Sequence, residues 1–191
     1  MKFHLLVTLV AFLSLAAVSN AAEKDVLPVP ALSGSGNMNN EFSLSEITSV
    51  RHNPWSTGYG VDGTISHYFT RYLGFSADAD VLRSDQNAMA AYGFRGGPTA
   101  RFFRNSRVQP FARALFGYGR LKEVENGPHR PYVNGFSYLA GGGTDVRFLG
   151  PLNVRLAADF ENDPGNGKSV TNNRLLRFGV GLSYHFGGYG R

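Results

Sequence analysis

The sequence contains no cysteine. A chain without cysteine forms no disulfide, and if it is exported it has no N-terminal cysteine to carry a lipid. Small disulfide scaffolds and lipoproteins are therefore excluded. The stability of the folded chain must come from its hydrogen-bonded strands or helices.

Long apolar runs are also missing, apart from one near the start. That run, residues 5–18, follows Lys2 and precedes the small residues Ser19 and Ala21. This order is typical of a secretory signal peptide, so we predict a signal at 1–21 with cleavage after Ala21 or Ala22. No later run is long and apolar enough for a helical membrane span.

Basic runs and metal-ligand spacings are absent as well. The formal charge is +5, but the cations are scattered, so we expect no nucleic-acid partner. The histidines and acids show no metal-ligand spacing. The glycine-rich stretches "GGPTA" and "AGGGTD" precede no helix pattern and are not phosphate loops. We predict no metal and no cofactor.

Glycine and aromatic residues are abundant, with 24 Gly, 15 Phe and 9 Tyr among 191 residues. This composition favours a single all-β domain. Residues 22–40, rich in Pro, Gly, Ser and Asn, are predicted to be a flexible N-terminal segment. A β-barrel is predicted at 41–186, followed by a short extension at 187–191.

Strict alternation marks the last predicted strand, "LLRFGVGLSYHF". Large apolar residues from Leu176 to Phe186 alternate with small, polar or charged ones, and this period of two is that of a β-strand with two unlike faces. Similar patterns predict eight strands, at about 41–51, 55–67, 72–83, 90–103, 108–121, 133–147, 152–161 and 174–186.

The predicted connections are of two kinds, in rotation. Short links around "YFTR", "RNSR" and "LGP" alternate with mostly longer polar ones near "HNPW", "SDQNAM", "KEVENGPHRPY" and "NDPGNGKSVTNN". Outer-membrane barrels have short periplasmic turns and longer external loops. The pattern predicts an eight-stranded antiparallel up-and-down transmembrane β-barrel in the bacterial outer membrane, with both termini in the periplasm.

The charged residues in the central parts of strands two to eight share one face, opposite the apolar residues. A soluble barrel or sandwich could show the same alternation, but the many glycines on the polar face suit a crowded barrel interior. We predict a paired charge network that plugs the lumen. Its members are Asp62, Asp78, Asp80, Arg95, Arg101, Arg113, Asp145, Arg147, Arg155, Asp159 and Arg177.

Aromatic residues gather where the periplasmic strand ends should lie, as a membrane-interface girdle would. The predicted girdle is Phe69, Tyr72, Phe102, Phe148, Tyr184 and Phe186. Strand one fits less well, because Glu46 interrupts its apolar set of Phe42, Leu44 and Val50.

Four segments, "VQPFARALFGYGR", "YLAGGGTDVRF", "NVRLAADFEN" and "RLLRFGVGLSYHF", give the chain a resemblance to the small outer-membrane barrels of the opacity-protein and outer-membrane-protein-A-like families. The resemblance covers about 41–186 and implies insertion by the barrel-assembly machinery. That machinery reads an aromatic-rich last strand ending in Phe, whereas here "GGYGR" follows Phe186.

These features predict a porin-like, non-enzymatic monomer embedded in outer-membrane lipid, with a structural or adhesive role through loops that bind a surface ligand. A narrow pore for small solutes and a soluble periplasmic ligand-binding barrel are the alternatives. Ser183, His185 and Asp159 could form a hydrolytic site, but their position near the periplasmic end favours a role as plain lumen residues.

Overall fold

The computed structural model describes residues 40–52, 55–84, 90–103, 106–122, 132–162 and 174–186. Within them lie eight strands: β1 (Asn40–His52), β2 (Trp55–Tyr68), β3 (Leu73–Ser84), β4 (Ala90–Arg101), β5 (Val108–Lys122), β6 (Tyr132–Leu149), β7 (Leu152–Asn162) and β8 (Arg174–Phe186). The predicted signal peptide, most of the flexible segment, the C-terminal extension and the two longest loops lie outside the described residues.

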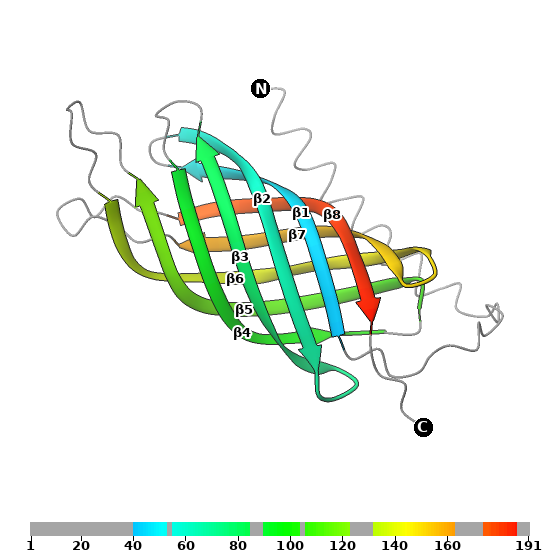
Figure 1. Cartoon of the computed structure of the whole chain (residues 1–191). Helices are drawn as coiled ribbons and strands as arrows, with labels where there is room; N and C mark the ends of the chain where they lie inside the picture. Colours follow the sequence, from blue (N-terminus) through cyan, green and yellow to red (C-terminus); the bar gives the residue numbers. More distant parts are fainter. Residues whose placement is uncertain are drawn as a thin grey trace. The chain divides into compact units, whose positions relative to one another are not determined.

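The strands form one closed barrel in chain order (Figure 1). Each strand pairs antiparallel with the next, and β1 closes the barrel by pairing with β8 over a register that runs from Asn40 opposite Phe186 to Arg51 opposite Leu175. The predicted eight-stranded antiparallel architecture is confirmed, and every predicted strand boundary lies within two residues of the observed one.

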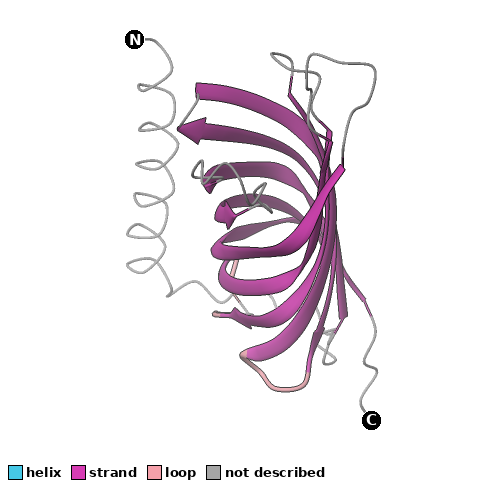
Figure 2. Cartoon of the chain, turned by 90° about the vertical axis from the view of Figure 1, so that its left-hand side faces the viewer, coloured by secondary structure: helices cyan, strands magenta, loops and turns pink. Residues whose placement is uncertain are grey.

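Three short turns, at 69–72, 102–107 and 150–151, lie at the end of the barrel where β1 begins and β8 ends. The strands curve around the barrel and tilt across it (Figure 2). The turn between β6 and β7 is the tightest, and Gly150 adopts a positive φ of 55° there. That conformation costs glycine little because it has no Cβ.

Polarity is inverted relative to a soluble barrel. Arg95, Asp145 and Arg177 are at most 1% exposed, whereas Phe94 is 66% exposed and Val180 is 59% exposed. The described strands therefore bury charge inside the barrel and present aromatic and aliphatic side chains outside. In the described part of the chain, no helix is long and apolar enough to cross a membrane.

Candidate functional site: the charged lumen

The lumen holds a dense set of ionisable side chains, all buried. Its arginines are Arg95, Arg101, Arg113, Arg155 and Arg177, and its carboxylates are Glu41, Asp62, Asp78, Asp80, Asp145, Asp159 and Glu161. We call these residues the lumen network. Strand alternation explains the arrangement, because every second residue of each strand must point inward.

One cluster of the network lies near the short-turn end. Arg155 binds Asp145 through two hydrogen bonds, from Nε to Oδ1 at 2.8 Å and from Nη2 to Oδ2 at 2.7 Å. Arg101 donates to the same carboxylate at 2.7 Å. Both arginines also pair with Glu41. Two buried guanidinium groups thus neutralise two buried carboxylates.

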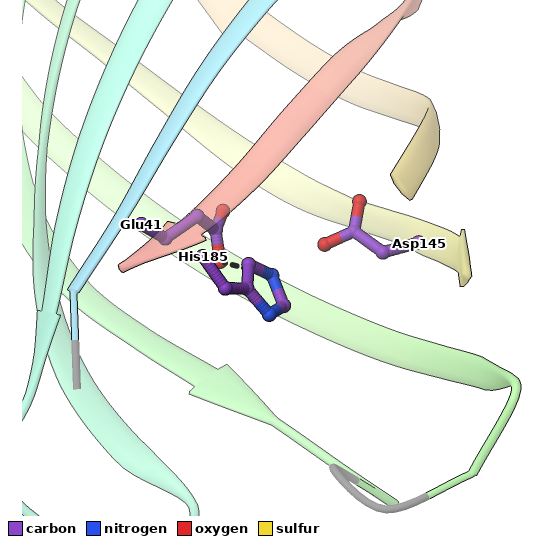
Figure 3. Close-up of side chains that lie close together, drawn as sticks. All are labelled: Glu41, Asp145 and His185. Carbon is purple, nitrogen blue, oxygen red and sulfur yellow. Dashed lines mark ion pairs between the residues drawn. The ribbon is translucent and has the colours of Figure 1, made fainter. Parts of the chain in front are cut away.

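His185 lies beside this cluster, with its Nε2 atom 3.4 Å from Glu41 Oε2 (Figure 3). The ligand atoms of Glu41, Asp145 and His185 lie within 4.8 Å of one another, close enough in principle for a metal ion. However, Arg101 and Arg155 already supply the positive charge that a cation would bring. The donor set therefore does not fit a metal site.

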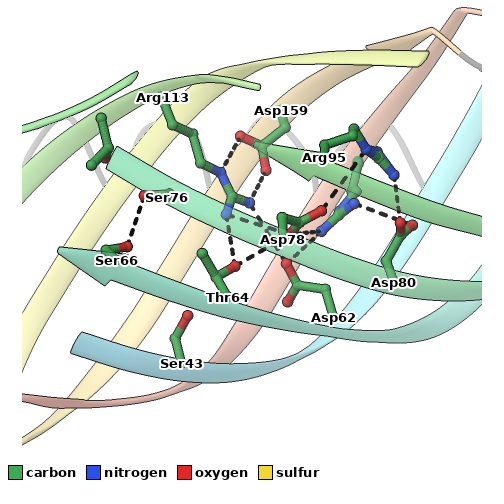
Figure 4. Close-up of polar contacts among 12 residues, drawn as sticks. Ser43, Asp62, Thr64, Ser66, Ser76, Asp78, Asp80, Arg95, Arg113 and Asp159 are labelled. Carbon is green, nitrogen blue, oxygen red and sulfur yellow. Dashed lines mark hydrogen bonds and ion pairs between the residues drawn. The ribbon is translucent and has the colours of Figure 1, made fainter. Parts of the chain in front are cut away.

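A second cluster occupies the middle of the lumen (Figure 4). Arg113 donates to Asp159 from Nε at 3.2 Å and from Nη2 at 2.7 Å. It also donates to Thr64 Oγ1, whose hydroxyl in turn donates to Asp78 at 3.2 Å. The planar guanidinium is thereby fixed at three of its donors.

Arg177 connects this cluster to a third. Its Nη2 atom faces Asp62 and lies 3.5 Å from Asp78, while Nη1 lies 3.4 Å from Asp80 and 3.5 Å from Glu161. Arg95 completes the third cluster by binding Glu161 at 2.7 Å and Asp80 at 2.5 Å. Four carboxylates from three different strands therefore share one arginine.

Apolar side chains complete the filling of the lumen. The Arg155 guanidinium lies over the Phe111 ring at 4.4 Å, and the Arg113 guanidinium lies 6.0 Å from the same ring. Phe111 thus separates the first cluster from the second. Other inward positions carry Ile47, Leu82, Leu115, Leu139, Leu121 and Leu175, all buried.

The structure places all but one of the predicted network residues in the lumen. Arg147 is the exception, because its side chain is exposed. It lies near the end of β6, where the register with β7 shifts between Arg147 and Leu149. The strand is irregular there, and the structure does not place Arg147 among the buried side chains of the lumen network.

Two acids of the lumen network, Glu41 and Glu161, were not predicted from the sequence. Glu41 begins the weakly patterned first strand, and Glu161 stands beside a polar loop. Glu161 could have been found from its spacing of two from Asp159, since residues two apart in a strand face the same side. Glu46, which broke the predicted pattern, lies on the outer face with Phe42 and Leu44.

The six predicted girdle residues are all exposed. Phe69, Tyr72, Phe102, Phe148, Tyr184 and Phe186 have exposed fractions between 41% and 72%. They lie in or beside the short turns or at the end of β8, and so encircle one rim of the barrel. Tyr184 and Phe186 stack, with ring centroids 6.3 Å apart.

Ser183, His185 and Asp159 do not assemble into a hydrolytic site. Asp159 is bound to Arg113. Ser183 Oγ accepts a hydrogen bond from Asn153 Nδ2 at 3.4 Å, and the same Nδ2 atom lies 3.3 Å from His185 Nε2. The histidine therefore has an amide and the first cluster as neighbours, without a serine positioned for activation.

The closed topology has counterparts among solved structures. Neisserial surface protein A matches with a TM-score of 0.62 and 13% identity, over 77% of this chain and 96% of that chain. The fold is that of the small outer-membrane barrels. OprG from Pseudomonas aeruginosa matches with a TM-score of 0.53 at 8% identity, over 78% and 96% of the two chains.

The N-terminal β-barrel domain of OprF from Pseudomonas aeruginosa is similar too, with a TM-score of 0.52 and 14% identity over 78% of this chain and 98% of that domain. No family model and no curated protein sequence matches the chain. At these identities the likeness concerns architecture, so what the protein does must be argued from its own residues.

Proposed function

We propose that the chain is an outer-membrane protein with a closed lumen, which acts as a structural element of the membrane and as a scaffold for its loops. The observation that carries this proposal is the lumen network itself. Five arginines and seven carboxylates are buried inside one eight-stranded wall. A barrel of this size has an interior just wide enough for side chains to fill.

The outer wall supports the location. Side chains such as Phe94, Ile65 and Val180 are 58% to 66% exposed. In water this much exposed apolar surface would drive aggregation, whereas in lipid it is the expected lining. A soluble periplasmic barrel would have the opposite polarity.

The orientation follows from the turns. Short turns lie at the end where both termini of the barrel emerge, and in bacterial outer-membrane barrels this end faces the periplasm. The other four connections would then face the exterior, where a surface ligand could bind them. Each chain closes its own barrel, so it needs no partner chain to fold, although insertion would use the barrel-assembly machinery.

A narrow pore for small solutes is the second candidate. Buried polar atoms without a hydrogen-bond partner among the described residues favour it, namely Asp62 Oδ1 and the Nε atoms of Arg95, Arg101 and Arg177. Buried groups of this kind are normally satisfied by water. A chain of such sites could pass a small ion if the side chains rearranged.

Conductance across a planar lipid bilayer separates the two candidates. We expect purified protein to give no steady current steps, with a large general porin as the positive control. Stable unitary steps whose frequency rises with the amount of protein would favour the pore. Recovery of the native protein in a salt wash without detergent would contradict the membrane location itself.

A further inference from the structure

Among the described residues, the outer wall carries one carboxylate at mid-height. Glu46 is the central residue of the 13-residue strand β1, and its side chain is exposed. Its register partners are Val61 near the centre of β2 and Val180 at the centre of the 13-residue strand β8. Those valines are 54% and 59% exposed. Glu46 therefore lies in the middle of the apolar band.

No side chain among the described residues satisfies that carboxylate. Among the described residues, Glu46 takes part in no hydrogen bond or ion pair. The nearest outward-facing cation among the described residues is Arg83 on β3, two strands from β1. It stands opposite Tyr59, which lies two residues from Val61 toward the long-loop end of β2. Neighbouring strands are about 4.8 Å apart, so about 10 Å of sheet separates Arg83 from Glu46, and the two side chains form no ion pair in the structure.

Lipid headgroups are also too far away. The apolar band of an outer-membrane barrel is about 25 Å tall, so a mid-height group lies about 12 Å from either interface. A glutamate side chain does not span that distance. An ionisable group at this depth is costly and generally marks a site where something else supplies its partner.

The outer surface around Glu46 is apolar. Leu44 precedes it on the outer face and is 56% exposed, and beside Leu44 in β2 stands Gly63, around whose Cβ position there is open space. Association there would bring apolar surfaces together around one polar group.

We propose that Glu46 is the contact point of a two-fold dimer of complete barrels, in which it hydrogen-bonds with Glu46 of a second copy. Copies with the same orientation in a membrane are related by an axis along the membrane normal, so any residue lies at the same depth in both. A carboxylic acid can donate and accept at once. Two facing acids therefore close a ring of two hydrogen bonds.

This inference rests on the proposed membrane location. Polar groups that meet between membrane segments contribute roughly 0.6–2 kcal/mol each, or about 3- to 30-fold in the dissociation constant. The dimer would therefore be weak and reversible, and it would depend on protein density in the membrane. It leaves the fold of each barrel unchanged.

The test is energy transfer between donor- and acceptor-labelled copies in lipid vesicles, over a series of protein-to-lipid ratios. Since the chain has no cysteine, one is appended after Arg191 for labelling. We expect Glu46→Val to weaken association about tenfold, and Glu46→Gln to keep it, because a carboxamide also donates and accepts. Thr48→Val, on the same face two residues away, is the matched control and should leave association unchanged.

A second variant keeps the carboxylate and removes its need for a partner. Val180→Arg places a guanidinium directly across from Glu46 in the same wall, so the pair forms within one barrel and association should fall as in Glu46→Val. Unchanged association in Glu46→Val or Val180→Arg, with all variants floating with the vesicles, would overturn the dimer alone. Failure of the wild type to float would overturn the membrane location.

Discussion

Asp62 and Glu46 are carboxylates near the middle of neighbouring strands, but they face opposite sides of the barrel wall. Asp62 is 3% exposed and pairs with Arg177, with Arg113 at 3.7 Å. Glu46 is exposed among valines and has no partner among the described residues. The difference is one of compensation. Arginines inside the barrel offset the cost of burying Asp62, whereas no described cation does so for Glu46 on the apolar exterior.

The largest expected effect comes from removing the shared arginine of the lumen. Arg177→Leu removes a guanidinium that four buried carboxylates share, so part of their negative charge is no longer compensated. These are Asp62, Asp78, Asp80 and Glu161. Breaking a buried ion pair in this way costs about 3–5 kcal/mol of unfolding free energy. The measurement is urea unfolding of the protein in vesicles.

Arg174→Leu is the control for that measurement, because Arg174 lies on the same strand but is exposed. Its replacement should change the unfolding free energy by no more than about 0.5 kcal/mol. Equal losses in the two variants would mean that the lumen network contributes nothing beyond ordinary surface charge.

A cation on the outer wall is the next largest perturbation. Ala79 is exposed near the middle of β3, between Gly63 and Phe94 of the neighbouring strands. Ala79→Arg should lower the unfolding free energy in vesicles by about 2–4 kcal/mol, the cost of a cation near the bilayer midplane. Wild-type stability in this variant would show that the outer face does not contact lipid.

A methyl group added inside the lumen should have a smaller and position-dependent effect. A Cβ at Gly181 would lie 2.5 Å from Ser45 Cα and would also meet the Leu44 carbonyl, whereas a Cβ at Gly179 would meet its nearest neighbour at 3.5 Å. Gly181→Ala should therefore cost about 1–3 kcal/mol through overpacking. Gly179→Ala, on the same strand and face, should be close to neutral in the same unfolding experiment.

The smallest expected effect sharpens the comparison between the two faces. Val180→Arg introduces a cation beside Glu46, and opposite charges across strands attract by about 0.2–1 kcal/mol. Its cost should therefore be smaller than that of Ala79→Arg by about that amount. The advantage should vanish in the Glu46→Val background, and its persistence there would show that Glu46 does not pair with position 180.

Much of the architecture could be predicted from the sequence because the period-two pattern is strong wherever one face contacts lipid. β8 matched its predicted bounds, and even the weakly patterned β1 was located within one residue. Alternation fixes which residues share a face, so ten of the eleven charged residues predicted to point inward from β2 to β8 are buried. The ion pairs between strands on opposite sides of the lumen could not be predicted from alternation, because they depend on the tilt of the strands and on how the barrel closes.

The prediction of the inward-facing residues failed mainly near the strand ends, where alternation along the strand no longer tells whether a side chain is buried in the lumen. Arg147 has the right spacing for the lumen but lies at an irregular strand end, where its side chain is exposed. The sequence around Glu41 and Glu161 alternates weakly or looks like a loop, so neither was predicted to point inward. In the structure Glu41 pairs with Arg155 and Glu161 pairs with Arg95. The buried Leu115 and Leu139 were not anticipated either, because the prediction treated the inner face as uniformly polar.

The central claim is that the polar face of this barrel is its interior and the apolar face contacts lipid. Phe111 and Phe116 offer a matched pair on β5, since Phe111 is 6% exposed and Phe116 is 51% exposed. With Trp55, the single tryptophan, replaced by Phe, either position can carry the only tryptophan in vesicles containing lipids brominated along their chains. We predict strong quenching in Phe116→Trp and little in Phe111→Trp. Equal quenching, or stronger quenching in Phe111→Trp, would contradict the assignment of the two faces.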